Sequence, residues 1–135
     1  MKKKELICIE CPAGCPLSVD IDGGKMAAVS GNKCPKGQEY AVSEIEDPRR
    51  ILTSAVLCEG LDVRMLPVRT DKPIPKARLM EAMEAIKAIR VKTPLKVGDI
   101  IAADFFGASL IATRGTLETR PAEPLRRSRH LYEAQ

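Results

Sequence analysis

Alternating apolar and polar residues near the start of the chain predict a β-hairpin. In residues 17–21, Leu, Val and Ile alternate with Ser and Asp, as in a half-buried strand. The tripeptide Asp22-Gly23-Gly24 is a strong turn signal, and residues 25–29 can return as the second strand. Residues 38–45 then have the pattern of a short helix, which we expect to end near Pro48.

A second region of strands surrounds one longer helix. Pro75 is expected to open this helix over residues 76–90, where apolar side chains recur at three- and four-residue spacing. Residues 96–99, Lys-Val-Gly-Asp, predict a turn that leads into a strand. The strands are predicted at residues 61–68, 100–106 and 110–114, with a hairpin turn at 106–109. The pattern indicates an α+β fold with one main helix and a few antiparallel strands.

Composition and charge exclude several classes of protein. Hydrophobic residues make up 44% of the 135-residue chain and aromatic residues only 3%, which predicts an aliphatic core. The net charge of +4 is modest, and its basic clusters, Lys2–Lys4 and Arg126–His130, lack the interleaved aromatics or recognition helix of a nucleic-acid-binding protein. Because His130 is the only histidine and lies in the tail, a histidine metal site and a Ser–His–Asp triad are excluded.

No targeting or membrane segment is expected. The opening Met1-Lys-Lys-Lys4 is similar to the basic start of a signal peptide, but Glu5 and Glu10 interrupt the apolar stretch that should follow. No apolar run approaches the roughly eighteen residues of a membrane span. The odd number of cysteines, five, fits poorly with a secreted disulfide framework, so we expect a cytoplasmic protein.

The cysteine spacing is the strongest chemical signal. Cys8, Cys11 and Cys15 fall within eight residues, and Cys34 follows nineteen positions later in Cys-Pro-Lys-Gly. Four thiolates can hold a [4Fe–4S] cluster, and the three-plus-one spacing favours a cluster over zinc, whose structural sites usually take two C-x2-4-C pairs. Zn²⁺ stays open as the alternative metal that the same four side chains would bind. Cys58, in an apolar stretch, is expected to lie apart as a buried thiol.

The residues around these cysteines resemble known sequences. Cys8-x2-Cys-Pro-Ala-Gly-Cys15-Pro-Leu-Ser-Val, with Gly31-Asn-Lys-Cys-Pro-Lys-Gly37, resembles the N-terminal [4Fe–4S] domain of molybdopterin oxidoreductases. Over roughly residues 5–115, the chain is similar to a family of small uncharacterised proteins with cysteine-pair motifs. Further resemblances to that family lie in Glu44–Thr53, Leu66–Thr70, Ile74–Lys76 and Lys96–Asp99.

The resemblance implies a function in electron transfer. Members of the small-protein family are associated with FAD-dependent oxidoreductases similar to anaerobic glycerol-3-phosphate dehydrogenase, which implies a non-catalytic iron–sulfur subunit that exchanges electrons with such a partner. Cys8, Cys11, Cys15 and Cys34 would be the ligands. In the molybdoenzymes the lysine two residues past the fourth cysteine lies between cluster and pterin, and Lys36 occupies that position here. The alternative function is a structural zinc-binding adaptor without a redox role.

These expectations divide the chain into three parts. Residues 1–59 would form the iron–sulfur unit of cysteine loop, hairpin and short helix, whose order depends on its metal. Residues 60–116 would form a small α+β docking domain. Residues 117–135, where apolar periodicity has faded and Pro121 and Pro124 interrupt a charged segment, would be a mobile tail.

Overall fold

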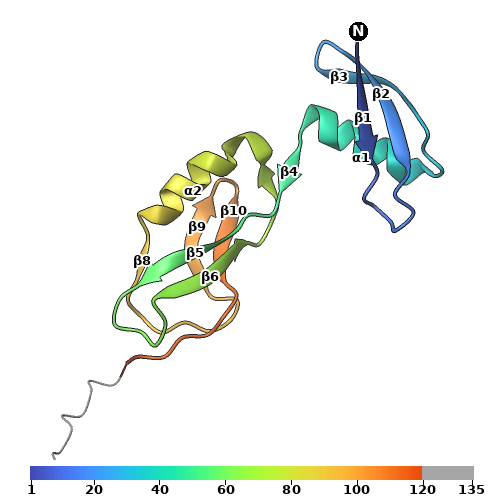
Figure 1. Cartoon of the computed structure of the whole chain (residues 1–135). Helices are drawn as coiled ribbons and strands as arrows, with labels where there is room; N and C mark the ends of the chain where they lie inside the picture. Colours follow the sequence, from blue (N-terminus) through green and yellow to red (C-terminus); the bar gives the residue numbers. More distant parts are fainter. Residues whose placement is uncertain (120–135) are drawn as a thin grey trace, which may run out of the picture.

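The computed structural model describes residues 1–119 of the chain and shows two larger sheets with separate cores, together with one small two-stranded sheet. The chain is mixed α and β, with a three-stranded sheet near the N-terminus and a five-stranded sheet built from the second half (Figure 1). Helix α1 (Pro35–Glu46) and the short strand β4 (Arg49–Arg50) join them. The mobile-tail prediction for residues 120–135 lies outside the described residues. No helix within residues 1–119 is long and apolar enough to cross a membrane.

The three-stranded sheet contains the predicted hairpin and one strand that we did not predict. Strands β2 (Pro16–Asp22) and β3 (Lys25–Ser30) pair antiparallel around Gly23 and Gly24, whose φ angles of 57° and 81° suit the tight turn. The extra strand is β1 (Lys2–Ile7), which pairs antiparallel with β2 and gives the order β1-β2-β3. Its basic residues lack an alternating pattern because the strand is at the sheet edge and almost wholly exposed.

Helix α1 begins three residues earlier than the apolar pattern indicated. Cys34, with φ −151° and ψ 166°, is the N-cap, and Pro35 occupies the first turn, where its missing N–H costs no hydrogen bond. The helix packs on β2 and β3, and its Ala41 is fully buried with Leu17 and Val19. This aliphatic cluster is the core of the N-terminal part.

The five-stranded sheet has the order β8-β5-β6-β10-β9 and holds the larger, mostly aliphatic core. Two of its strands were predicted closely: β9 (Ile100–Phe105) and β10 (Ala108–Ala112), which form a hairpin. Strand β6 spans Met65–Thr70, so the prediction of a strand over 61–68 was displaced towards the N-terminus. Strand β5 (Thr53–Cys58) was not predicted, and it pairs antiparallel with β6.

The main helix is shorter than its apolar spacing indicated. Residues Lys76–Arg78 form a 3-10 turn, η1, and α2 spans Leu79–Lys87. Pro75 does not open the helix but lies in β7 (Ile74–Pro75), which pairs with β4. At the other end the chain leaves the helix to form β8 (Arg90–Val91), which pairs parallel with β5. This pair is parallel, whereas the other pairs of the five-stranded sheet are antiparallel, as expected for a few of its strands.

The division between the two parts differs from the expected boundary at residue 59. That boundary falls between β5 and β6, which are hydrogen-bonded neighbours in one sheet. The first core includes residues up to Ile45 and the second begins at Leu52, so the change from one core to the other falls between these residues. Residues 117–119 were expected to belong to the tail, but the backbone of Leu117 and Thr119 is hydrogen-bonded to that of Asp62 and Gly60.

Candidate metal centre

Each of the four N-terminal cysteines lies at a junction between elements. Cys8 directly follows β1, Cys15 directly precedes β2, and Cys11 lies in the loop between them. Cys34 follows β3 and caps α1. The junctions are related by the sheet topology. In this antiparallel sheet, the end of β1, the start of β2 and the end of β3 lie at the same end of the sheet. The fold therefore brings all four cysteine-bearing segments to the same end of this sheet.

Two of the four cysteines are buried side by side. Cys8 and Cys15 are 4% and 7% exposed and belong to the same core cluster as Leu17, Val19 and Ala41. The Cys8 N–H donates a hydrogen bond to the Cys15 carbonyl oxygen at 2.9 Å. Their loop leaves the sheet between them and carries Cys11, whose side chain is exposed.

Cys34 is held near the start of β2 by close packing of its own loop. An added Cβ at Gly31 would lie 2.2 Å from the carbonyl oxygen of Pro16, so the two backbones approach too closely for any other residue. The Cys34 carbonyl oxygen accepts hydrogen bonds from the Asn32 Nδ2 at 3.2 Å and from the Gly37 N–H at 3.2 Å. The Cys34 side chain itself is exposed.

The expected convergence of the four thiols on one point is absent from this arrangement. Within residues 1–119, no three Cys, His, Asp or Glu side chains lie where they could together hold a metal ion. All five cysteines are free. The donor set suits a soft metal or cluster in number, chemistry and location at one end of the sheet, but Cys11 and Cys34 would have to turn inward from their loops to join Cys8 and Cys15.

Two further residues that the sequence singled out lie in different sheets or elements from one another. Cys58 ends β5 in the other sheet, where burial raises the pKa of its half-buried thiol. Lys36 lies in the first turn of α1, two residues after Cys34, and its side chain is exposed. Its ammonium group makes no hydrogen bond or ion pair within residues 1–119, which leaves its charge available near the four junctions.

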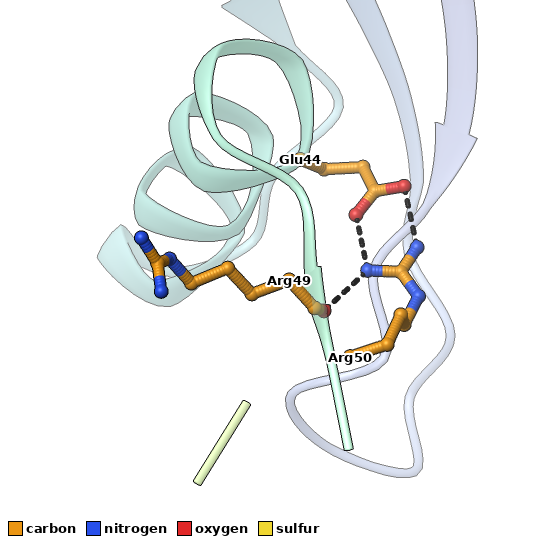
Figure 2. A network of polar contacts seen from close by, with 3 residues as sticks. All are labelled: Glu44, Arg49 and Arg50. Atoms are coloured by element: carbon orange, nitrogen blue, oxygen red, sulfur yellow. Dashed lines mark hydrogen bonds and ion pairs between the residues drawn. The ribbon is translucent and has the colours of Figure 1, made fainter. Parts of the chain in front are cut away.

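An ion-pair network fixes the end of α1 to β4 (Figure 2). The Arg50 guanidinium donates to both carboxylate oxygens of Glu44, at 2.7 and 2.9 Å, and also to the Arg49 carbonyl oxygen at 2.8 Å. The hydrogen bonds from Arg50 hold the pKa of Glu44 below its ordinary value. The acidic cluster Glu44, Glu46 and Asp47 was predicted to be a salt-bridged surface, and the Glu44–Arg50 and Asp47–Arg49 pairs confirm this for two of its members.

A surface hollow beside the cysteine end was missed by the sequence analysis. It has a volume of about 360 Å³ and is lined by residues of β1 and β2, Glu5, Leu6, Ile7, Pro16, Leu17 and Ser18. Next to it, Ile7 and Ile9 are 57% and 73% exposed. The sequence feature that could have indicated the hollow is the apolar residues at positions 6, 7 and 9. They become a surface feature only once β1 is paired with β2.

The comparisons with known proteins cover only part of the chain. No curated protein matches this chain. A similar solved structure is the NMR structure of the Clostridium perfringens protein CPE0013, with 20% identity and a TM-score of 0.49 over 54% of this chain and 89% of that one. A family model described as "Protein of unknown function (DUF1667)" matches residues 35–114 and so begins just after Cys34. Because the match spans more than half of the chain, this protein belongs to the DUF1667 family.

Proposed function

We propose that this protein is an iron–sulfur electron-transfer subunit that works with an FAD-dependent oxidoreductase of the glycerol-3-phosphate dehydrogenase type. Cys8, Cys11, Cys15 and Cys34 would hold a [4Fe–4S] cluster. The observation that carries the proposal is the sheet topology, which brings Cys34 to the same end of a small sheet as the three cysteines close together in sequence. Such clusters are held by four cysteine thiolates.

The surroundings of the four cysteines suit a negatively charged redox centre. Cys8 and Cys15 are buried in an aliphatic cluster, which shields that side of the site from water. Cys34 stands at the N-terminus of α1, where free backbone N–H groups favour negative charge, and Lys36 adds a cation in the first turn. A bound cluster supplies one-electron transfer, while the chain sets the electrostatics around it.

The electrons would come from a partner, because residues 1–119 show no group suited to accept a hydride. Its sequence contains no dinucleotide-binding fingerprint, and its one histidine lies beyond the described residues. The network around Glu44 is an ion pair and not an acid–base pair, since both partners are held in their charged forms. A flavin on the partner can accept a hydride and release single electrons, which complements a one-electron carrier.

Metal analysis of anaerobically purified protein tests the cofactor. We expect a brown protein with about four iron and four sulfide per chain. Cys34→Ser should lose most of this iron, whereas the matched control Cys58→Ser, in the other sheet, should keep it. One zinc per colourless chain would support the zinc-binding adaptor instead, and equal iron loss in the two variants would refute the ligand set.

A reduction assay tests the partnership separately. The full chain is mixed anaerobically with its co-purifying flavoprotein, and cluster bleaching is followed after the substrate of the flavoprotein is added. We expect bleaching only when both proteins are present. Substrate oxidation by the isolated chain would overturn the assignment of a subunit without its own turnover.

A further inference from the structure

Cys8 and Cys15 face each other where the β1–β2 hairpin meets its connecting loop. The ladder between the strands pairs Ile7 with Pro16. One step further, the Cys8 N–H donates to the Cys15 carbonyl oxygen at 2.9 Å. Residues that face each other across an antiparallel pair have Cα atoms about 4.5–5.5 Å apart, within the range of roughly 4.4–6.8 Å that a disulfide spans.

The two side chains also lie on the same face of the sheet. Cys15, Leu17 and Val19 alternate along β2 and so share one face, and all three are buried. Cys8 is buried in the same cluster, under Ala41 of α1. The backbone pairing and the shared burial therefore direct both thiols into one small aliphatic space.

The other two N-terminal cysteines have no such arrangement. Cys11 lies exposed in the loop between the paired residues, and Cys34 lies exposed at the N-cap of α1. Within residues 1–119, no backbone hydrogen bond joins either of them to another cysteine. Among these four thiols, only Cys8 and Cys15 are held opposite each other by the backbone.

We propose that Cys8 and Cys15 form an intramolecular disulfide when no metal occupies them, with a low-molecular-weight disulfide such as oxidised glutathione as the oxidant. One cysteine thiolate attacks the glutathione disulfide and releases one glutathione thiol. The second cysteine thiolate then displaces the bound glutathione as another thiol. The two protein thiols lose two electrons, the oxidant gains them, and the two thiol protons pass to the released glutathione.

This disulfide would also control loading of the metal site, a consequence that rests on the proposed function. Metal ligation needs deprotonated thiols, and the disulfide removes two of the four. The metal-free protein would then bind its metal only under conditions that reduce the Cys8–Cys15 bond. The disulfide itself needs only the hairpin geometry, so it can form whether the metal is iron, zinc or neither.

Two matched variants of the full chain test the pairing. One keeps only Cys8 and Cys15, with Cys11→Ser, Cys34→Ser and Cys58→Ser. The control keeps only Cys11 and Cys34, with Cys8→Ser, Cys15→Ser and Cys58→Ser. Both are equilibrated in glutathione redox buffers, quenched with acid, alkylated and weighed by mass spectrometry.

We expect the first variant to lose two hydrogens without a glutathione adduct. Its midpoint should lie at a glutathione ratio at least about tenfold more reducing than that of the control, because facing thiols have the higher effective concentration. Glutathione adducts on Cys8 and Cys15, or equal midpoints for the two variants, would overturn the proposal.

Mapping in the unsubstituted chain gives an answer even if either variant fails to fold. After metal removal by chelation and oxidation by glutathione disulfide, trypsin releases residues 5–25, which contain Cys8, Cys11 and Cys15. Fragmentation should show Cys11 alkylated and Cys8 linked to Cys15, while a bond that includes Cys11 or Cys34 refutes the pairing. The measurement uses metal-free protein, so failure of the iron assignment does not affect its outcome.

Discussion

At the scale of single residues, Arg50 ties the helix that follows the cysteine loop to the start of the second part of the chain. Its planar guanidinium matches the two oxygens of Glu44 and still reaches the Arg49 carbonyl oxygen. The Glu44 side chain is only 10% exposed, whereas that of Arg50 is 40% exposed, so solvent screens the pair from one side. The pair therefore orients the end of α1 relative to β4 and contributes only a modest free energy to folding.

We expect Glu44→Gln to lower the stability of the N-terminal part slightly at neutral pH. The folded-state pKa of Glu44 lies below its ordinary value of 4.5, because Arg50 binds its charged form. The extra stability is thus complete above the ordinary pKa and disappears as the pH falls through the lower folded-state pKa. Urea unfolding of both proteins at neutral pH and in acid should show a difference that vanishes in acid.

Glu81→Gln is the matched control for this prediction. Glu81 also receives a bidentate pair, from Arg78, but both side chains are largely exposed, at 61% and 49%. Screening should leave the urea midpoint of this variant unchanged. An effect equal to that of Glu44→Gln would show that burial of Glu44 has no role.

Lys36 provides a second prediction at this scale. A positive charge near a cluster favours the reduced, more negative state, so Lys36→Ala should lower its reduction potential. Redox titration of the holoprotein measures this shift. Lys25→Ala, at the opposite end of β3 from the cysteines, is the control and should leave the potential unchanged. Equal potentials for the two variants would make Lys36 an ordinary surface residue.

At the scale of elements, the loop from β3 to α1 determines where Cys34 lies. Gly31, with φ +90°, turns this loop against the backbone of Pro16, immediately after Cys15. Further along, an added Cβ at Gly37 would lie 2.7 Å from the Asn32 Cβ, so the first turn of α1 also packs tightly on the loop. The position of the fourth cysteine relative to the third thus depends on two glycines.

Gly31→Ala should unfold the cysteine end of the sheet. An alanine there has an unfavourable φ, about 1–2 kcal/mol, and its Cβ overlaps the Pro16 oxygen, which adds about 1–3 kcal/mol of strain. Gly24→Ala is the control because Gly24 also has a positive φ, +81°, but its Cβ would meet nothing within 4 Å. We expect thermal unfolding to show the larger loss for Gly31→Ala, together with reduced metal content. Equal losses would contradict the close packing.

At the scale of the whole molecule, the two cores differ in the number of buried residues that stabilise them. The cluster in the five-stranded sheet contains twelve buried residues, whereas the N-terminal cluster contains five, two of which are Cys8 and Cys15. So small a core has little apolar surface to bury and gains more from a bound metal. We infer that the N-terminal part is the less stable of the two without its metal.

Hydrogen exchange with and without metal tests this difference. Chelation should raise exchange in residues 8–47 more than in residues 60–115, because metal binding contributes only to the folding of the first segment. The second segment serves as the internal control within each sample. If chelation changed protection equally in the two segments, the metal dependence would be refuted.

The sequence alone determined those elements whose causes lie within a few residues. The β2–β3 hairpin follows from the alternation in residues 17–21 and the Asp-Gly-Gly turn, and the β9–β10 hairpin from two apolar runs around Phe106-Gly107. The cysteine spacing likewise predicted a group of four side chains, and an isolated Cys58, before any fold was known. The DUF1667 match supports none of these four as ligands, since it covers only residues 35–114.

Only the tertiary structure decided the elements that depend on distant partners. The exposed edge strand β1 exists because β2 offers its hydrogen bonds, and β5 exists because β6 and β8 flank it. The same long-range pairing ends the main helix at Lys87, although apolar residues continue to Ile89, since Arg90 and Val91 join the sheet. It also made the four cysteines unequal, because pairing of β1 with β2 buries Cys8 and Cys15 and leaves Cys11 and Cys34 exposed. Local sequence cannot encode such differences, because they depend on which segments meet after folding.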